Sequence, residues 1–259
     1  MNVRRIIIVA GIGLAVLAGA SATLAATDVN TYTARLTFQA GKAHALGFTE
    51  TLTAANANPS DRPAPLKDVK TTIYGIRSHA GSFPTCDGPR MSIDKSDGFC
   101  PAKALVASGP VAAQLGDPTL MGSSPPCKSL LHVWNGGKAR LWFFFTTDAR
   151  HRCGSLRTGD TAAFAGTVKE LGKNEVINVS LPADVSTSVA SIPGLYGSLV
   201  KAVLTFRKLT TKVKRKTVAF NESFACMSGQ RPYRVQFTAA TSHGPETQTV
   251  QGTARCATR

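Results

Sequence analysis

The chain has 259 residues and carries 30 Lys and Arg against 15 Asp and Glu, which gives a formal net charge of +15. With 43% hydrophobic residues, its composition excludes wholesale disorder. The basic balance favours anionic partners such as teichoic or phospho-glycan polymers, acidic lipid headgroups or nucleic acid. The alternative is that the protein is one of the many secreted bacterial proteins that are simply basic.

The first 22 residues have the pattern of a secretory signal peptide. Arg4 and Arg5 form the positive region, residues 6–17 form the apolar run, and Ala20-Ser21-Ala22 is a small-x-small cleavage site. Cleavage as late as residue 26 is an alternative. An uncleaved anchor is the rival interpretation, but the run is shorter than the roughly 20 apolar residues that cross a bilayer. We therefore expect a protein secreted by a bacterium or held in its cell envelope.

After a linker at residues 23–30, residues 31–259 predict one disulfide-stapled β domain, built as one sheet or as two packed sub-sheets. No later stretch is long and apolar enough to cross a membrane, so we expect no transmembrane span after removal of the leader. Neither the oligomeric state nor the strand order follows from the sequence.

The hydrophobic pattern has a period of two residues along most of this domain. Tyr32, Ala34, Leu36 and Phe38 alternate with polar residues, as in a half-buried strand. Further predicted strands are 48–53, 69–76, 130–134, 138–145, 162–168, 176–181, 199–209, 212–220, 233–238 and 247–251. Many short strands with turns between them predict an all-β fold, an antiparallel sandwich or a barrel-like domain.

Turn and helix signals are few. Asn135-Gly136 predicts a tight primed turn between two strands. The segment 82–101 is expected to be a loop that its two cysteines close. A helix over 102–115 is interrupted by Gly109-Pro110, and 185–191 predicts one or two helical turns capped by Asp184.

Six cysteines behind a leader predict structural disulfides in an oxidising compartment. Fifteen pairings are possible, and we favour the couples that are local in sequence. No CxxC occurs, and no histidine stands at ligand spacing from two cysteines, so zinc is not expected. The favoured couples are Cys86–Cys100, Cys127–Cys153 and Cys226–Cys256.

No residue set forms a catalytic constellation. The five histidines match no metal or triad motif, GxSxG is absent, and there is no phosphate-binding or dinucleotide loop. Asp94 to Gly98 lacks the full calcium-loop pattern and fits a turn better. Glu170 and Glu175 could form a glycosidase pair only if folding brings them together. We expect no metal, no cofactor and no catalytic residue.

The most suggestive feature is a basic run between residues 207 and 216. On a strand, Lys212, Lys214 and Lys216 would project to one face, where with Arg215 they could bind phosphates or uronates. The alternative is that these lysines guard an exposed edge strand against aggregation. No aromatic residues alternate with the lysines, so we expect no sequence-specific nucleic-acid binding.

Three segments resemble a pattern in uncharacterised secreted actinobacterial proteins that are β-rich and contain cysteines. The segments are Phe83-Pro84-Thr85-Cys86 with Cys100-Pro101-Ala102-Lys103-Ala104, the tail from Ser223-Phe224-Ala225-Cys226 through 233–237 to Arg255-Cys256, and 62–66. The resemblance implies export, β structure and cysteine pairs, and it implies no activity.

The leading hypothesis is a non-enzymatic cell-envelope or extracellular protein that binds an anionic polymer or lipid surface through a basic face. The residues expected to make that contact are Lys212, Lys214, Arg215 and Lys216. Two alternatives stand beside it: an extracellular hydrolase of envelope glycan or lipid, and a structural β module that contacts another protein.

Overall fold

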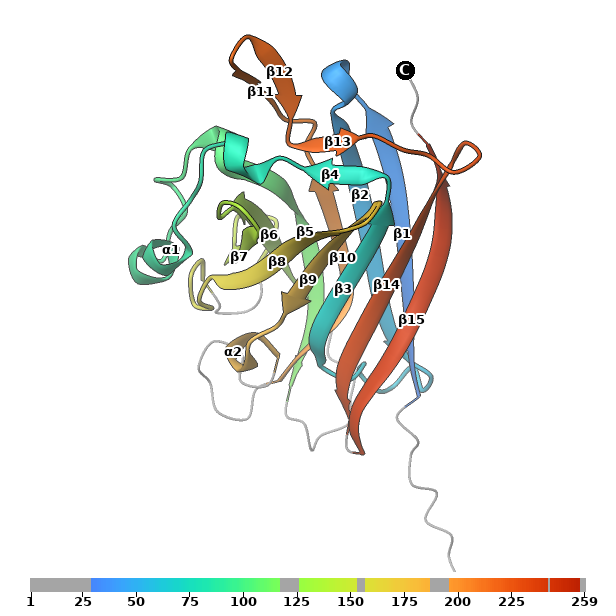
Figure 1. Cartoon of the computed structure of the whole chain (residues 1–259). Helices are drawn as coiled ribbons and strands as arrows, with labels where there is room; N and C mark the ends of the chain where they lie inside the picture. Colours follow the sequence, from blue (N-terminus) through green and yellow to red (C-terminus); the bar gives the residue numbers. More distant parts are fainter. Residues whose placement is uncertain (1–28, 117–125, 153–156, 187–195, 242, 257–259) are drawn as a thin grey trace, which may run out of the picture.

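The computed structural model describes residues 29–116, 126–152, 157–186, 196–241 and 243–256 (Figure 1). The predicted leader, 1–22, and most of the linker lie outside these residues. The strands are β1 Asn30–Ala40, β2 Leu46–Asn56, β3 Leu66–Tyr74, β4 Ile76–Ser78, β5 Leu105–Gly116, β6 Cys127–Asn135, β7 Arg140–Thr146, β8 Phe164–Leu171, β9 Asn174–Ser180, β10 Tyr196–Phe206, β11 Thr210–Val213, β12 Lys216–Ala219, β13 Asn221–Ser223, β14 Gln230–Thr241 and β15 Gly244–Arg255. The helices are η1 Lys42–His44, η2 Ala80–Ser82, α1 Gly88–Asp94, η3 Ala102–Ala104 and α2 Ala183–Ser186.

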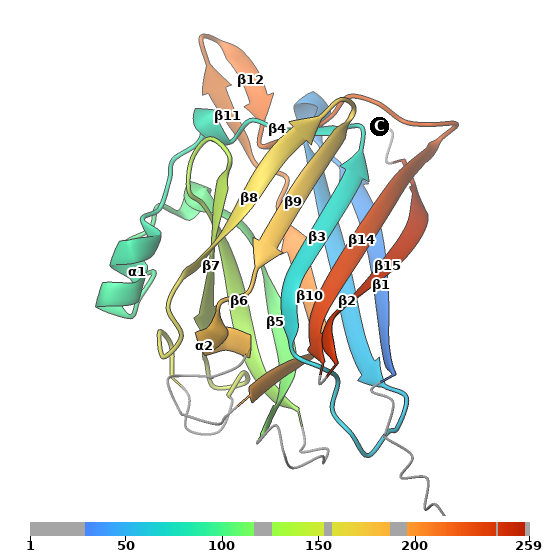
Figure 2. The ribbon, with the colours of Figure 1, turned by 60° about the horizontal axis from the view of Figure 1, so that its bottom comes forward.

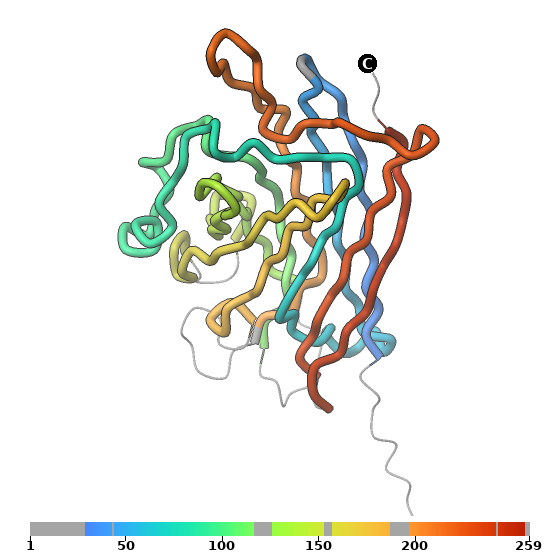
Figure 3. The backbone as a smooth tube through the Cα atoms, in the orientation of Figure 1, coloured from blue at the N-terminus to red at the C-terminus, as the bar shows by residue number. Residues whose placement is uncertain are grey.

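Eleven strands form one antiparallel sheet in the order β1-β2-β10-β5-β6-β7-β8-β9-β3-β14-β15. The sheet curls so far that its two edge strands, β1 and β15, lie side by side, as the tube in Figure 3 shows. Side chains bridge this seam: the Tyr32 amide donates to Gln248 Oε1 at 3.1 Å, and the Tyr233 hydroxyl donates to the Ala34 carbonyl at 3.3 Å. The all-β prediction is therefore confirmed, as a nearly closed barrel.

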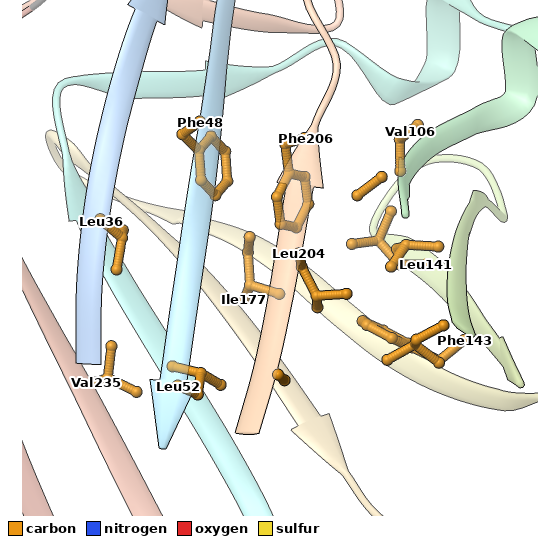
Figure 4. Packing of buried hydrophobic residues seen from close by; sticks show 14 of the residues in the cluster. Leu36, Phe48, Leu52, Val106, Leu141, Phe143, Ile177, Leu204, Phe206 and Val235 are labelled. Atoms are coloured by element: carbon orange, nitrogen blue, oxygen red, sulfur yellow. The ribbon is translucent and has the colours of Figure 1, made fainter. Parts of the chain in front are cut away.

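Apolar and polar side chains alternate along the strands, and the apolar ones point into the barrel interior and fill most of it. On β2 the inward Phe48 and Leu52 are buried, while the intervening threonines are partly exposed. Phe48 stacks on Phe206 of β10 with ring centroids 4.1 Å apart (Figure 4). Burying one such ring contributes roughly 1.5–3 kcal/mol, so the period-two pattern that predicts the strands also stabilises the closed sheet.

The upper end of the barrel in Figure 1 is covered by a small two-stranded sheet of β4 and β13. Arg231, inside β14, fixes this cap: its guanidinium donates to the Tyr74 carbonyl at 2.6 Å and to the Ser223 hydroxyl at 2.6 Å. The guanidinium also lies over the Phe38 ring, 5.2 Å from its centroid. The lower end, turned forward in Figure 2, is the end at which α2 lies.

Two disulfides are confirmed. Cys86 and Cys100 pair across 14 residues with Cα atoms 5.2 Å apart, and Cys226 and Cys256 pair across 30 residues at 6.2 Å. Cys127 is also disulfide-bonded. Its predicted partner, Cys153, lies outside the described residues.

The segment predicted as a plain loop between Cys86 and Cys100 contains α1, so that prediction is wrong. Asp87 caps this helix by accepting the Arg90 amide at 3.3 Å, and Lys95 ends it in the left-handed region with φ of 48°. Met91 buries itself against Trp134 and Phe144 in a second, smaller core. A helix of seven residues carries too short a pattern to be recognised beside the surrounding Gly and Pro.

The predicted β6–β7 hairpin is confirmed, but its turn is not the expected two-residue Asn-Gly turn. β6 ends at Asn135 and β7 begins at Arg140, so four residues connect the strands, and the positive φ angles fall on Gly137 and Ala139. Asn135 is instead buried. Its amide donates to the carbonyls of Ala80, Phe83 and Pro84 at 2.9, 3.3 and 2.9 Å. Tertiary hydrogen bonds have overridden the local turn preference.

Among the described residues, no helix is long and apolar enough to cross a membrane. The predicted short helix after Asp184 is α2, Ala183–Ser186, and the rest of its predicted span from residue 187 lies outside the described residues.

Candidate functional site

The barrel is not filled completely, and its interior holds an apolar cavity of about 100 Å³. The lining side chains come from eight strands that face one another, with Leu131 and Phe143 on one side and Val69 and Ile177 on the other. Such a volume is far more than the ~10–15 Å³ that one water needs, but an apolar wall gives water few partners. The cavity therefore favours an apolar occupant.

One carboxyl group, Glu50, lines this apolar interior. Glu50 lies on β2 between Phe48 and Leu52, at a position where the alternation points inward. Its Oε1 accepts a hydrogen bond from the Thr71 hydroxyl at 2.7 Å. Burial raises the pKa of Glu50, and the Thr71 hydrogen bond only partly opposes this. A raised pKa favours the neutral acid, which can donate a hydrogen bond into the cavity.

A second cavity of about 110 Å³ continues the first toward the end of the barrel where α2 lies. The two cavities share five lining residues: Leu66, Val111, Phe145, Leu181 and Leu199. The outer cavity is also lined by Arg157, which is exposed, and by Asp160, which is partly exposed, so it reaches the molecular surface. The interior is thus an apolar channel with a polar rim and a carboxyl group at its inner part.

A different pocket, of about 500 Å³, lies at the capped end. It is polar and lies between the β4–η2 segment, the β8–β9 hairpin and the β6–β7 connection. The side chains that give it this character are Ser78, His79, Ser82, Lys138, Glu170 and Glu175.

Glu170 and Glu175 are directly opposite each other on β8 and β9. The hydrolase hypothesis required these two carboxylates to come together, and the fold places them as cross-strand neighbours, whose Cβ atoms typically lie about 4.5–5.5 Å apart. They differ in environment. Glu170 is exposed and pairs with Arg77 at 3.2 Å, whereas Glu175 is only 1% exposed.

Neither carboxyl oxygen of Glu175 has a hydrogen-bond partner in good geometry. Burial is the main reason that the pKa of Glu175 is raised to about 7; hydrogen bonding by Ser78 opposes this rise, and the charge of Glu170 adds to it. A buried polar group without a partner costs about 1–3 kcal/mol, so native proteins contain few of them. The buried carboxyl group of Glu175 therefore lacks a well-placed hydrogen-bond donor within the protein.

The four predicted contact residues lie on the β11–β12 hairpin, which projects beyond the capped end of the barrel (Figure 1). The expected single row of lysines on one strand is wrong. Val213 pairs with Lys216, so Lys214 and Arg215 form a two-residue turn with φ of 46° and 68°. Lys212 and Lys216 therefore point to opposite faces of the hairpin. All four side chains are exposed, and Val213 between them is 38% exposed.

Three histidines are paired with carboxylates. His79 Nε2 lies 2.6 Å from Glu222 Oε2, His132 Nδ1 lies 2.6 Å from Asp97 Oδ2, and His151 Nδ1 lies 2.8 Å from Asp148 Oδ1. Asp97 also accepts from Trp134 Nε1 at 3.1 Å. Within the described ranges, no group of three or more His, Cys, Asp or Glu is arranged to hold a metal ion.

Sequence reasoning missed Glu50, although a signal was present. Glu50 occupies an inward position of an otherwise apolar alternation, and an acid at such a position is rare unless it is paired or functional. Comparison with family models, with curated proteins and with solved structures finds no match for this chain.

Proposed function

We propose that this chain is an exported protein that binds one slim apolar ligand, of the acyl-chain type, inside its barrel. The observation that carries the proposal is the apolar channel, in which two cavities of about 110 and 100 Å³ share a wall and reach the surface beside α2. A comparable apolar cavity of about 150 Å³ in another protein stays dry and binds benzene. A single chain or ring fits this size, and a bulky steroid-like molecule does not.

The rim and the inner carboxyl group favour an amphipathic ligand. An apolar chain entering the channel gains about 0.8 kcal/mol for each CH₂ group that it buries. Its polar end would then lie at the rim, where the exposed Arg157 can bind a carboxylate or phosphate. Burial raises the pKa of Glu50 and so favours its neutral form, which would place no ionic charge in the apolar wall against the chain.

The test is a fluorescence titration with a dansyl-labelled C11 fatty acid, with decanoic acid as competitor. We expect saturable binding with a blue-shifted emission and displacement by the competitor. Ala113→Phe places a ring in the outer cavity, whose wall includes Ala113, and should weaken binding about tenfold or more.

Ala112→Phe is the matched control, because Ala112 is the next residue on β5 and points to the opposite face. It should bind the probe as the wild type does. Absence of saturable binding to the wild type, or equal affinities of the two variants, would refute the proposal.

The second candidate is attachment to an anionic polymer or lipid surface through the basic hairpin, defined as Lys212, Lys214, Arg215 and Lys216. The hairpin cations do not guard the edges of the main sheet, which are β1 and β15; β11 and β12 form a separate two-stranded sheet, in which each strand keeps one free edge. The exposed Val213 adds an apolar side chain among the cations, a combination suited to a lipid interface.

Sedimentation with anionic phosphatidylglycerol vesicles and with purified envelope tests this second function. Replacing the four hairpin cations by Gln should abolish a binding that weakens as salt rises. Replacing Lys67, Lys128, Lys169 and Lys173, which are exposed elsewhere, removes the same charge and should change binding much less. Binding insensitive to salt, or equally reduced in both variants, would contradict the role of the hairpin.

A further inference from the structure

We propose that the polar pocket at the capped end is a binding site for a small hydroxylated molecule that carries a primary ammonium group, held by Glu175 and Glu170. This site is separate from the apolar channel, since the pocket and the two cavities share none of their lining residues. The proposal therefore goes beyond the function inferred above and can fail without affecting it.

The first step of the argument is the unsatisfied carboxyl group. Glu175 lines the pocket, is 1% exposed, and has no hydrogen-bond donor in good geometry on either oxygen, although Ser78 lies close enough to lower its pKa. An ionised carboxyl group accepts up to about four hydrogen bonds, and an ammonium group donates three from one point charge. A ligand with such a group would supply well-placed donors to the oxygens of Glu175, to which the protein offers only Ser78 in poor geometry.

The second step is the charge around Glu175. Its cross-strand neighbour Glu170 is a second acid on the same pocket wall, and two adjacent carboxyl groups resist joint ionisation. A bound cation relieves this repulsion. Two of the basic side chains near the pair are already engaged: Arg77 pairs with Glu170 at 3.2 Å, and His79 is paired with Glu222 at 2.6 Å.

The third step is the remainder of the wall. Ser82 and Ser78 offer hydroxyl oxygens, and Lys138 from the β6–β7 connection supplies one cation on the pocket wall. The Ser78 hydroxyl already donates to Asn221 Oδ1 at 2.9 Å, so toward a ligand it is an acceptor. A volume of about 500 Å³ admits a ligand of several polar groups. These partners fit an amine that also carries hydroxyl groups.

The test uses ethanolamine and ethylene glycol, which differ only in the replacement of the ammonium group by a hydroxyl group. Amide shifts of the ¹⁵N-labelled protein are followed at pH 8. We expect saturable shifts around β4, η2 and the β8–β9 hairpin with ethanolamine and none with ethylene glycol. No saturable shift with ethanolamine, or equal binding of the glycol, would overturn the proposal.

Glu175→Gln keeps the shape of the side chain and removes its charge, so it should lower the affinity for ethanolamine at least tenfold. Glu246→Gln on β15, an exposed position outside the pocket, is the control and should bind as the wild type does. Retention of wild-type affinity by Glu175→Gln overturns the proposal.

The wild-type protein offers a measurement that does not depend on the fold of a variant. With a pKa of about 7, Glu175 is about nine-tenths ionised at pH 8 and about one-tenth at pH 6, so the affinity should fall about tenfold. Glu170, Lys138 and His79, which is paired with Glu222, also line the pocket. The same pH series on Glu175→Gln separates their contribution, and an unchanged pH dependence in that variant overturns the assignment. Parallel titrations with glucosamine and with phosphoethanolamine then distinguish an amino sugar from a phospholipid headgroup as the molecule that carries the ammonium group. Binding of either supports the proposal.

Discussion

The environment of Glu175 makes a sharp prediction about stability. Its pKa rises from 4.5 in the unfolded chain to about 7 in the native state, because the carboxyl group is buried. Between these two values the native state holds a proton that the unfolded state has released, so unfolding becomes easier as pH rises. The stability is therefore fully present below pH 4.5 and is lost as pH rises through about 7. A shift of this size corresponds to about 3 kcal/mol in all.

Glu175→Gln removes this titration. Urea unfolding of the wild type and the variant at pH 5 and pH 8 should show that the variant gains about 2–3 kcal/mol relative to the wild type at the higher pH. The pKa of Glu50 is also raised by burial, but its contribution to the pH dependence cancels in this comparison because Glu50 is present in both proteins. A difference between the two proteins that stays constant from pH 5 to pH 8 would refute the reasoning, and Glu246→Gln should show that constant difference.

Two further predictions concern the elements that fix the fold. Asn135→Ala removes the side-chain amide that donates to the carbonyls of Ala80, Phe83 and Pro84 and should lower the free energy of unfolding by about 3 kcal/mol. The exposed Lys173→Ala should change it by less than about 0.5 kcal/mol, and equal effects in urea titrations would contradict the role of Asn135. Replacing Cys86 and Cys100 by Ser opens a 14-residue loop and should cost about 3 kcal/mol, and the same change at Cys226 and Cys256 opens a 30-residue loop and should cost about 4 kcal/mol. The reverse order of the two losses would show that native-state contacts, not loop entropy, dominate.

Much of the fold could be predicted from local pattern. The alternation in β1 and β2 predicts which side chains face the core, since the two-residue period of a strand depends only on backbone geometry. The cysteine couples 86–100 and 226–256 are local in sequence, so adjacent strands and loops bring them together. Export, the leader and the suspected family resemblance stay predictions.

The turn predictions show where local reasoning ends. Asn135-Gly136 carries the stronger hairpin signal, yet the two-residue turn with both φ angles positive is Lys214-Arg215. The Asn135 side-chain amide donates to carbonyls about fifty residues earlier in the chain, and these three tertiary hydrogen bonds outweigh a local turn preference. In the basic hairpin, the Lys214-Arg215 turn places Lys212 and Lys216 on opposite faces.

Composition and period alone determined that this chain forms β-strands and bears a large positive charge, because these properties depend only on which residues are present and on their local order. The sequence favoured cysteine pairs that are local, and the structure confirmed two of them, Cys86–Cys100 and Cys226–Cys256. Closure of the sheet decided the rest. The curl that brings β1 beside β15 creates the apolar channel and places Glu50 within it. The β8–β9 hairpin sets Glu175 opposite Glu170, and the β4–η2 segment and the β6–β7 connection complete the pocket around them. These sites depend on contacts between residues far apart in the chain, and no local pattern encodes which strands meet or how much space remains between them.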